Sequence, residues 1–147
     1  MQTSDIKGFV PQTLDQAMAR VVASLTDKDR KDILASKNAT EGHFSIGMLL
    51  RNEWGLWKDG TPFKQDIKSR FNLFGHADDC SSLILSGVFA FVKGKDVDSV
   101  LAKEVARFEK HWIKQGLDPA TGKPVAKVHK TIKKTPRSVK PYDPFDL

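Results

Sequence analysis

Side chains that could carry chemistry gather in two stretches of the sequence, residues 42–57 and residues 75–82. The candidate site residues in these stretches are His43, Arg51, Asn52, Trp54, Trp57, His76, Asp78 and Asp79. Two imidazoles and two carboxylates that converge in space would suit a metal ion or acid–base catalysis. An enzyme or metal site at His76, Asp78 and Asp79 is therefore one hypothesis for this chain.

The same residues have a structural interpretation, to which we give more weight. Asp78 and Asp79 lie where a helix is expected to begin, so either carboxylate could cap that helix and complement its dipole. The other carboxylate could accept a bidentate hydrogen bond from Arg51. Trp54 and Trp57 would wall this network, each with a hydrogen bond from its indole N–H. We expect a structural polar network without a cofactor.

Several motifs of common active sites are absent from the sequence. It contains no H-E-x-x-H zinc motif, no P-loop and no G-x-S-x-G nucleophile elbow. The one cysteine, Cys80, allows neither an internal disulfide nor a cysteine-based zinc cluster. Its place near an expected helix start could lower the pKa of its thiol, although a small buried apolar role is commoner. We therefore predict a protein that is not an enzyme, with no catalytic residue and no metal.

The two stretches resemble the motifs of an uncharacterised bacterial and phage domain family. The family patterns are H-F-x-x-G-x-x-(I/L)-R-N-x-W-G-L-W and H-P-D-D-x-S, and this chain reads H-F-S-I-G-M-L-L-R-N-E-W-G-L-W and H-A-D-D-C-S. Ala77 stands where the second pattern has proline. The resemblance covers residues 10–95 and implies a domain without an assigned activity, encoded by a phage or mobile element.

Helical periodicity predicts the elements that must position these residues. Runs of apolar residues with three- and four-residue spacing follow polar capping residues, namely Thr13, Thr26, Thr40, Thr61 and Asp96. We predict an all-α core over residues 13–116, a single compact bundle of five to six helices after an N-terminal lead of residues 1–12.

The most apolar segment, residues 83–92, is apolar on nearly all helical faces. A helix of this kind is typical of the middle of a bundle. A buried strand is the alternative, which the absence of partner strands disfavours.

The charge of the chain is concentrated toward its C-terminal end. The 147 residues carry 24 bases and 18 acids, a net charge of +6, of which residues 117–147 contribute +4. No apolar run reaches the roughly 20 residues of a membrane span, and the first residues lack the order of a signal peptide. We therefore expect no membrane partner and a cytoplasmic location, or the virion for a phage structural protein.

Residues 117–147 read as an extended basic arm, because five of the seven prolines lie in them. Residues 123–140 contain seven bases and no acid. The last six residues are acidic and aromatic, which is typical of a short docking motif. The predicted partner-binding residues are Lys123, Lys127, Lys130, Lys133, Lys134, Arg137, Lys140, Tyr142, Phe145 and Leu147.

These features favour an interaction protein that docks on a protein assembly or host complex through its arm. A nucleic-acid-binding accessory protein is the second hypothesis, because a segment of 18 residues with seven bases and no acid would attract phosphates. No aromatic residue lies between Lys123 and Lys140 to stack on single-stranded bases. A solvated tail and a short amphipathic helix on a partner also remain open, and no small-molecule substrate is evident.

Overall fold

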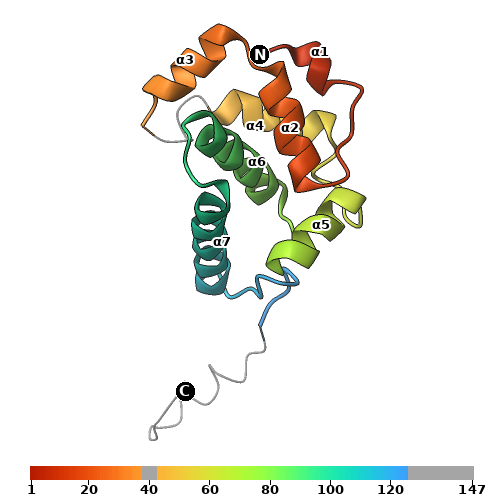
Figure 1. Ribbon diagram of the computed structural model, residues 1–147. Coiled ribbons are helices and arrows are strands. Elements are labelled where there is room, and N and C mark those ends of the chain that lie inside the picture. The colour runs from red at the N-terminus through yellow and green to blue at the C-terminus, as the bar shows by residue number, and fades with distance from the viewer. Residues whose placement is uncertain (38–42, 126–147) are drawn as a thin grey trace, which may run out of the picture.

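The computed structural model describes residues 1–37 and 43–125, with residues 43–45 as backbone only. Within these ranges the chain forms seven helices and no strand beyond one isolated bridge (Figure 1). The helices are α1 (Thr3–Ile6), α2 (Leu14–Ser24), α3 (Asp27–Ala35), α4 (His43–Glu53), α5 (Pro62–Phe71), α6 (Ala77–Val92) and α7 (Val97–Lys114). The predicted all-α class is confirmed.

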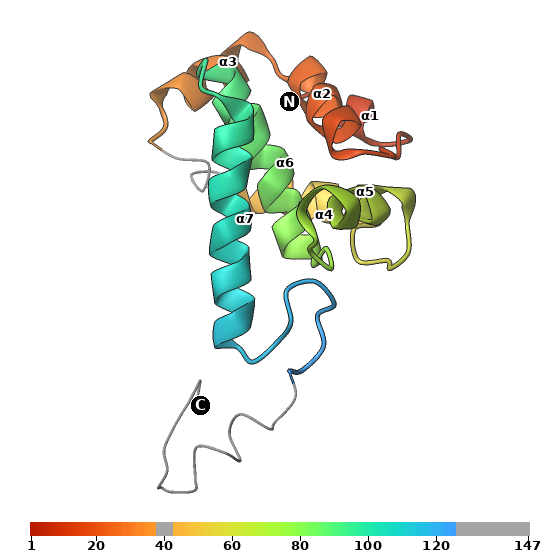
Figure 2. The same ribbon diagram turned by 60° about the horizontal axis from the view of Figure 1, so that its bottom comes forward.

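Helix α6 lies at the centre and packs against α2, α3, α4 and α7. Figure 2 shows α7 running alongside it. Residues 83–90 are all buried, as expected for a helix that is apolar on every face. The predicted central helix is confirmed, and the strand alternative is wrong. Within the described ranges, no helix has both the length and the apolar character needed to span a membrane.

Four of the predicted capping residues begin helices as expected. Thr13, Thr26, Thr61 and Asp96 each accept a hydrogen bond from the backbone N–H three residues later. Each bond satisfies one of the donors that a helix start leaves unpaired. The fifth predicted cap, Thr40, lies outside the described residues.

The N-terminal lead of residues 1–12 packs on the core through a short helix. It contains α1, whose Ile6 is fully buried, and this short helix packs against α2. The backbone N–H of Gln2 donates to the Ser24 carbonyl at 2.8 Å. Helix α1 is also why the described chain has one helix more than the predicted maximum. Its four residues are too few to show a helical apolar repeat in the sequence.

The predicted extended arm differs from the structure over its first nine residues, because residues 117–125 turn back on themselves. An antiparallel bridge joins Leu117 to Pro124, and the Val125 amide donates to the Gly116 carbonyl at 3.0 Å. The described fold therefore continues nine residues past the end of the predicted core. We call residues 117–125 the C-terminal turn.

Contacts with the α5 region hold the C-terminal turn on the core. The Phe74 amide donates to the Pro119 carbonyl at 2.9 Å, and Lys68 Nζ donates to the Ala120 carbonyl at 2.6 Å. Gly122 approaches the ring of Phe74 so closely that a Cβ there would lie 2.8 Å from a ring carbon. This side-chain and backbone packing could not be read from the proline-rich composition of the segment.

Candidate functional site

His76 caps α6 through its imidazole ring. Its Nδ1 accepts a hydrogen bond from the backbone N–H of Asp78 at 3.0 Å. The prediction that an aspartate caps this helix is wrong, because α6 begins at Ala77 and both Asp78 and Asp79 lie in its first turn. There the carboxylates complement the positive end of the helix dipole. An Nδ1 that accepts a hydrogen bond carries no proton, so this contact needs the unprotonated nitrogen.

Arg51 reaches from α4 to two points on α6. Its Nη1 donates to Ser81 Oγ at 2.8 Å, and its Nε lies 3.5 Å from Asp78 Oδ1. Ser81 Oγ in turn donates to the Asp78 carbonyl at 3.0 Å. The Arg51 side chain is only 12% exposed, whereas that of Asp78 is 64% exposed. The predicted pairing of Arg51 with this acidic turn is observed, but the guanidinium divides between two groups and is not bidentate on one carboxylate.

Asp79 connects α6 to α7. Its Oδ2 accepts a hydrogen bond from the indole N–H of Trp112 at 2.7 Å. Burial raises the pKa of the Asp79 carboxyl above its ordinary value of 3.8, and the Trp112 hydrogen bond offsets this in part. Sequence reasoning missed Trp112 here. It lies near the end of α7, 33 residues after Asp79, so no local pattern indicates the partner of its indole.

Aromatic rings surround His76 and extend the contact between α6 and α7. The ring centroids of His76 and Trp112 lie 5.3 Å apart, as do those of Phe74 and Trp112. The ring of Trp57 lies 5.9 Å from that of His76, and 57% of Trp57 is exposed. The Trp57–His76 and Phe74–Trp112 contacts have the edge-to-face geometry that aromatic quadrupoles favour, as does the contact of Phe74 with His76 at 6.3 Å. We call Trp57, Phe74, His76 and Trp112 the aromatic cluster.

Trp54 lies away from the aromatic cluster, and the prediction that it walls the network is wrong. It is buried, and its indole N–H donates to the Ile6 carbonyl at 2.9 Å. Its ring packs edge-to-face against Phe9 with centroids 6.2 Å apart. Trp54 and Trp57 are three residues apart in sequence, but α4 ends at Glu53, before both, and Gly55 between them has a positive φ, so no helix holds the two rings on one face. Asn52 is exposed on α4.

The metal hypothesis finds no support among the side chains that the structure describes. These contain no group of three or more His, Cys, Asp or Glu residues that could hold a metal ion. His43 begins α4, but its side chain lies outside the described part of the chain. Its convergence with His76 stays a prediction.

Cys80 is a small buried residue and not an activated thiol. Its side chain is fully buried, with Sγ 3.5 Å from the Gly75 carbonyl. Burial raises the pKa of the thiol to about 12, so the structure agrees with the small buried role and not with the alternative of a lowered pKa. At neutral pH the residue is protonated and a poor nucleophile.

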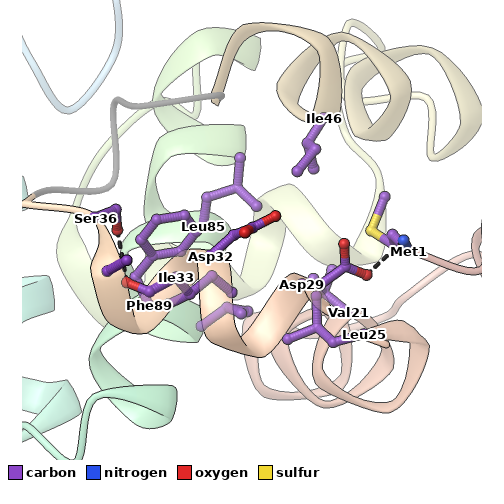
Figure 3. Close-up of a pocket in the computed structure, with 12 residues that line it drawn as sticks. Met1, Val21, Leu25, Asp29, Asp32, Ile33, Ser36, Ile46, Leu85 and Phe89 are labelled. Carbon is purple, nitrogen blue, oxygen red and sulfur yellow. Dashed lines mark hydrogen bonds and ion pairs between the residues drawn. The ribbon is translucent and has the colours of Figure 1, made fainter. Parts of the chain in front are cut away.

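A separate pocket of about 480 Å³ lies beside α2, α3 and α6 (Figure 3). Its walls are mainly apolar, and Asp29 and Asp32 also line it. The Asp29 carboxylate forms an ion pair with the amino group of Met1 at 2.5 Å and accepts a hydrogen bond from the backbone N–H of Thr26 at 2.9 Å. No local sequence pattern indicates this pocket, because its lining comes from four helices and the N-terminal residue. We call it the apolar pocket.

Of the predicted partner-binding residues, Lys123 belongs to the C-terminal turn and is exposed. The others lie outside the described residues, namely Lys127, Lys130, Lys133, Lys134, Arg137, Lys140, Tyr142, Phe145 and Leu147.

The fold and the candidate site together define a small all-α domain in which polar and aromatic contacts tie α4 and α7 to the start of α6. A family model described as a domain of unknown function (DUF6794) matches residues 10–90, which is more than half of the chain. The chain belongs to this family. No curated protein and no solved structure matches the chain.

Proposed function

We propose that this chain is a non-enzymatic interaction protein that docks on a protein partner or assembly through residues 126–147. The anchored C-terminal turn is the observation that carries this proposal. Main-chain hydrogen bonds tie the turn to Gly116 and Phe74, so the segment that follows Val125 starts from one defined point on the core. A binding segment with a defined origin searches less space than one that begins in a free linker.

The sequence of residues 126–147 supports the chemistry of this docking. Its basic part is matched to an acidic surface, while Tyr142, Phe145 and Leu147 supply apolar groups for a pocket. The partner that fits both parts is a protein assembly with an acidic face and an apolar recess. Nucleic acid would use the basic part alone.

The candidate site supports a non-enzymatic role. Hydrogen bonds within the chain already occupy the side chains of Arg51, His76 and Asp79. Cys80 is protonated and buried. Catalytic groups instead need to reach a substrate within hydrogen-bond distance. The same contacts explain why residues of these types occur together, since they join three helices.

Transfer of residues 126–147 to an unrelated carrier protein tests the proposal. The carrier receives the natural segment or, as a matched control, the same residues in scrambled order. After nuclease treatment of a lysate of the source organism, the natural segment should enrich a specific protein at least about tenfold over the scrambled one.

Equal capture by both segments would contradict protein docking. Capture that is independent of residue order, disappears with nuclease and falls steeply with salt would instead establish the nucleic-acid hypothesis, because phosphate contacts release counterions.

A further inference from the structure

A second pocket, of about 350 Å³, lies between α6 and α7 and has a strongly basic lining. The bases that line it are Lys37, Lys93, Lys95, Lys103 and Arg107. The loop between the two helices supplies Lys93 and Lys95, and α7 supplies Lys103 and Arg107. We call this pocket the basic pocket.

One acid, Glu104, is among the residues that line the basic pocket, and Arg107 neutralises it. The guanidinium binds the Glu104 carboxylate at two points, at 2.8 and 3.1 Å. Ser86 Oγ donates to the same carboxylate at 3.3 Å. Five bases against one acid leave the lining with a net charge of +4. A ligand for this pocket is therefore anionic.

The lining also contains apolar residues, which decide what kind of anion fits. Phe89, Ala90 and Val100 contribute them, from α6 and α7. A volume of about 350 Å³ is near the lower end for ligand pockets, so it admits one or two side chains rather than a large molecule. The pocket thus suits an aromatic group flanked by carboxylates.

We propose that the basic pocket binds the C-terminal segment of the same molecule, Tyr142–Leu147. This segment carries two carboxylates, Asp143 and Asp146, and no base, so its charge is complementary to that of the pocket. Phe145 lies between the two acids and provides the aromatic anchor. Pro141 and Pro144 restrict the backbone of the segment and lower the entropy lost on docking.

The intervening chain is long enough for docking within one molecule. Val125 is bonded to Gly116, one residue beyond the C-cap of α7, and Lys103 lies eleven residues before the last residue of that helix. At about 1.5 Å per residue this part of α7 spans roughly 17 Å. Residues 126–141 span up to roughly 50 Å when extended. The segment can therefore return along α7 to the basic pocket.

Other pockets suit this segment less well. The apolar pocket is lined by Asp29 and Asp32, which would repel an acidic segment. A further pocket near the C-terminal turn is lined by Lys64, Lys68 and Asp59, and the amine of Lys64 lies 3.4 Å from the Asp59 carboxylate, so the lining has a net charge of only +1. Lys93 of the basic pocket donates to the Ser36 carbonyl, a neutral group that leaves its positive charge uncompensated.

This inference goes beyond the proposed function and stands without it, because docking in the pocket needs no partner. If both hold, the docked segment has to leave the pocket before its apolar groups reach a partner. The basic pocket would then compete with the partner for Phe145.

Zero-length carbodiimide coupling of the purified full-length chain tests the inference. The reagent joins a carboxylate to a lysine only where the two are in contact, and peptide mass spectrometry of the monomer locates the links. We expect links from Asp143 or Asp146 to Lys93, Lys95 or Lys103, in at least about fivefold excess over links to the exposed Lys58.

Two variants provide the comparison. Phe145→Ala keeps every carboxylate and lysine but removes the anchor, so links to the pocket should fall at least about fivefold. Val139→Ala, outside the docking segment, should leave them unchanged.

Three outcomes would overturn the inference. They are links spread evenly over exposed lysines, links confined to the lysines of residues 127–140, and links found only in a dimer whose share grows with protein concentration. None of these depends on an external partner, so the result is separate from that of the carrier experiment.

Discussion

Arg51 and Asp78 form an ion pair whose two members contribute unequally to stability. Arg51 is mostly buried and also binds Ser81, so Arg51→Met should lower the free energy of unfolding by about 1–3 kcal/mol, since it breaks a charged hydrogen bond. Asp78 is mostly exposed, so Asp78→Asn should cost less than about 1 kcal/mol. Urea unfolding of both variants measures the difference. Equal effects would show that the ion pair, and not the contact with Ser81, is the main contribution.

The buried carboxyl of Asp79 makes stability depend on pH. Because its pKa is raised in the folded state, ionisation opposes folding, and stability is lost as the pH rises from 3.8 through the raised value. Asp79→Asn keeps an acceptor for Trp112 without the charge. At pH 7 this variant should unfold at a higher urea concentration than the natural chain, and the advantage should vanish near about pH 3. A variant less stable than the natural chain at pH 7 would contradict a raised pKa at Asp79.

Sequence reasoning identified several of the right residues for this cluster but not their partners. Capping and charge preferences correctly predicted a helix start close to Asp78 and Asp79 and the contact of Arg51 with this turn. Trp54 and Trp57 have the same side chain and lie three residues apart, but α4 ends before both of them. Trp54 therefore contacts Ile6, whereas Trp57 contacts His76. Trp112 is 33 residues from Asp79, and no local rule connects two positions so far apart.

At the level of helices, Gly87 permits the close packing of α2 on α6. A Cβ at this position would lie 2.2 Å from Met18 Sδ of α2 and 3.5 Å from a methyl carbon of Leu101 of α7. Gly87→Ala should therefore destabilise the fold by about 1–3 kcal/mol, because the Met18 side chain must leave its place against α6.

A double-mutant cycle identifies the cause. In a Met18→Ala background the clash is gone and alanine is the better helix former, so Gly87→Ala should be neutral or stabilising there. Additive effects of the two substitutions in thermal unfolding would contradict the contact.

Substitutions at two glycines of the C-terminal region distinguish the cost of backbone strain from the cost of lost packing. Gly116 and Gly122 both have positive φ, but only at Gly122 would a Cβ meet another group, the ring of Phe74. Alanine at either position should cost about 1–2 kcal/mol for the left-handed backbone. Gly122→Ala should cost about 1–3 kcal/mol more and should speed hydrogen exchange of the Phe74 amide, which is bonded to Pro119. Equal losses would mean that the turn does not pack on the core.

The helices were easier to predict than the segments between and beyond them. Capping residues and apolar stripes are local signals, and Thr13, Thr26, Thr61 and Asp96 lie where these signals place them. The C-terminal turn depends on contacts with Phe74 and Lys68, which are about 50 residues away in sequence. Proline content predicted the end of the helices but not this return to the core.

At the level of the whole molecule, charge is divided between a nearly neutral helical part and a basic end. Residues 1–116 have a net charge of +2, and the seven bases of residues 123–140 account for the basic character of the chain. Six of those bases follow the C-terminal turn. A division of this kind allows the core to fold by apolar burial and leaves the charged segment to the proposed binding role.

The proposal that residues 126–147 bind a partner while the rest of the chain forms the fold is tested most directly with a chain that ends at Val125. This truncation keeps the contacts of the C-terminal turn, which a cut at residue 116 would remove together with the proposed binding segment. Its unfolding and its capture of partners from a nuclease-treated lysate are measured beside those of the full chain. We predict a midpoint of thermal unfolding within about 2 °C of the full chain's and the loss of the captured protein. A truncated chain that captures the same protein with undiminished yield would contradict the proposed role of residues 126–147.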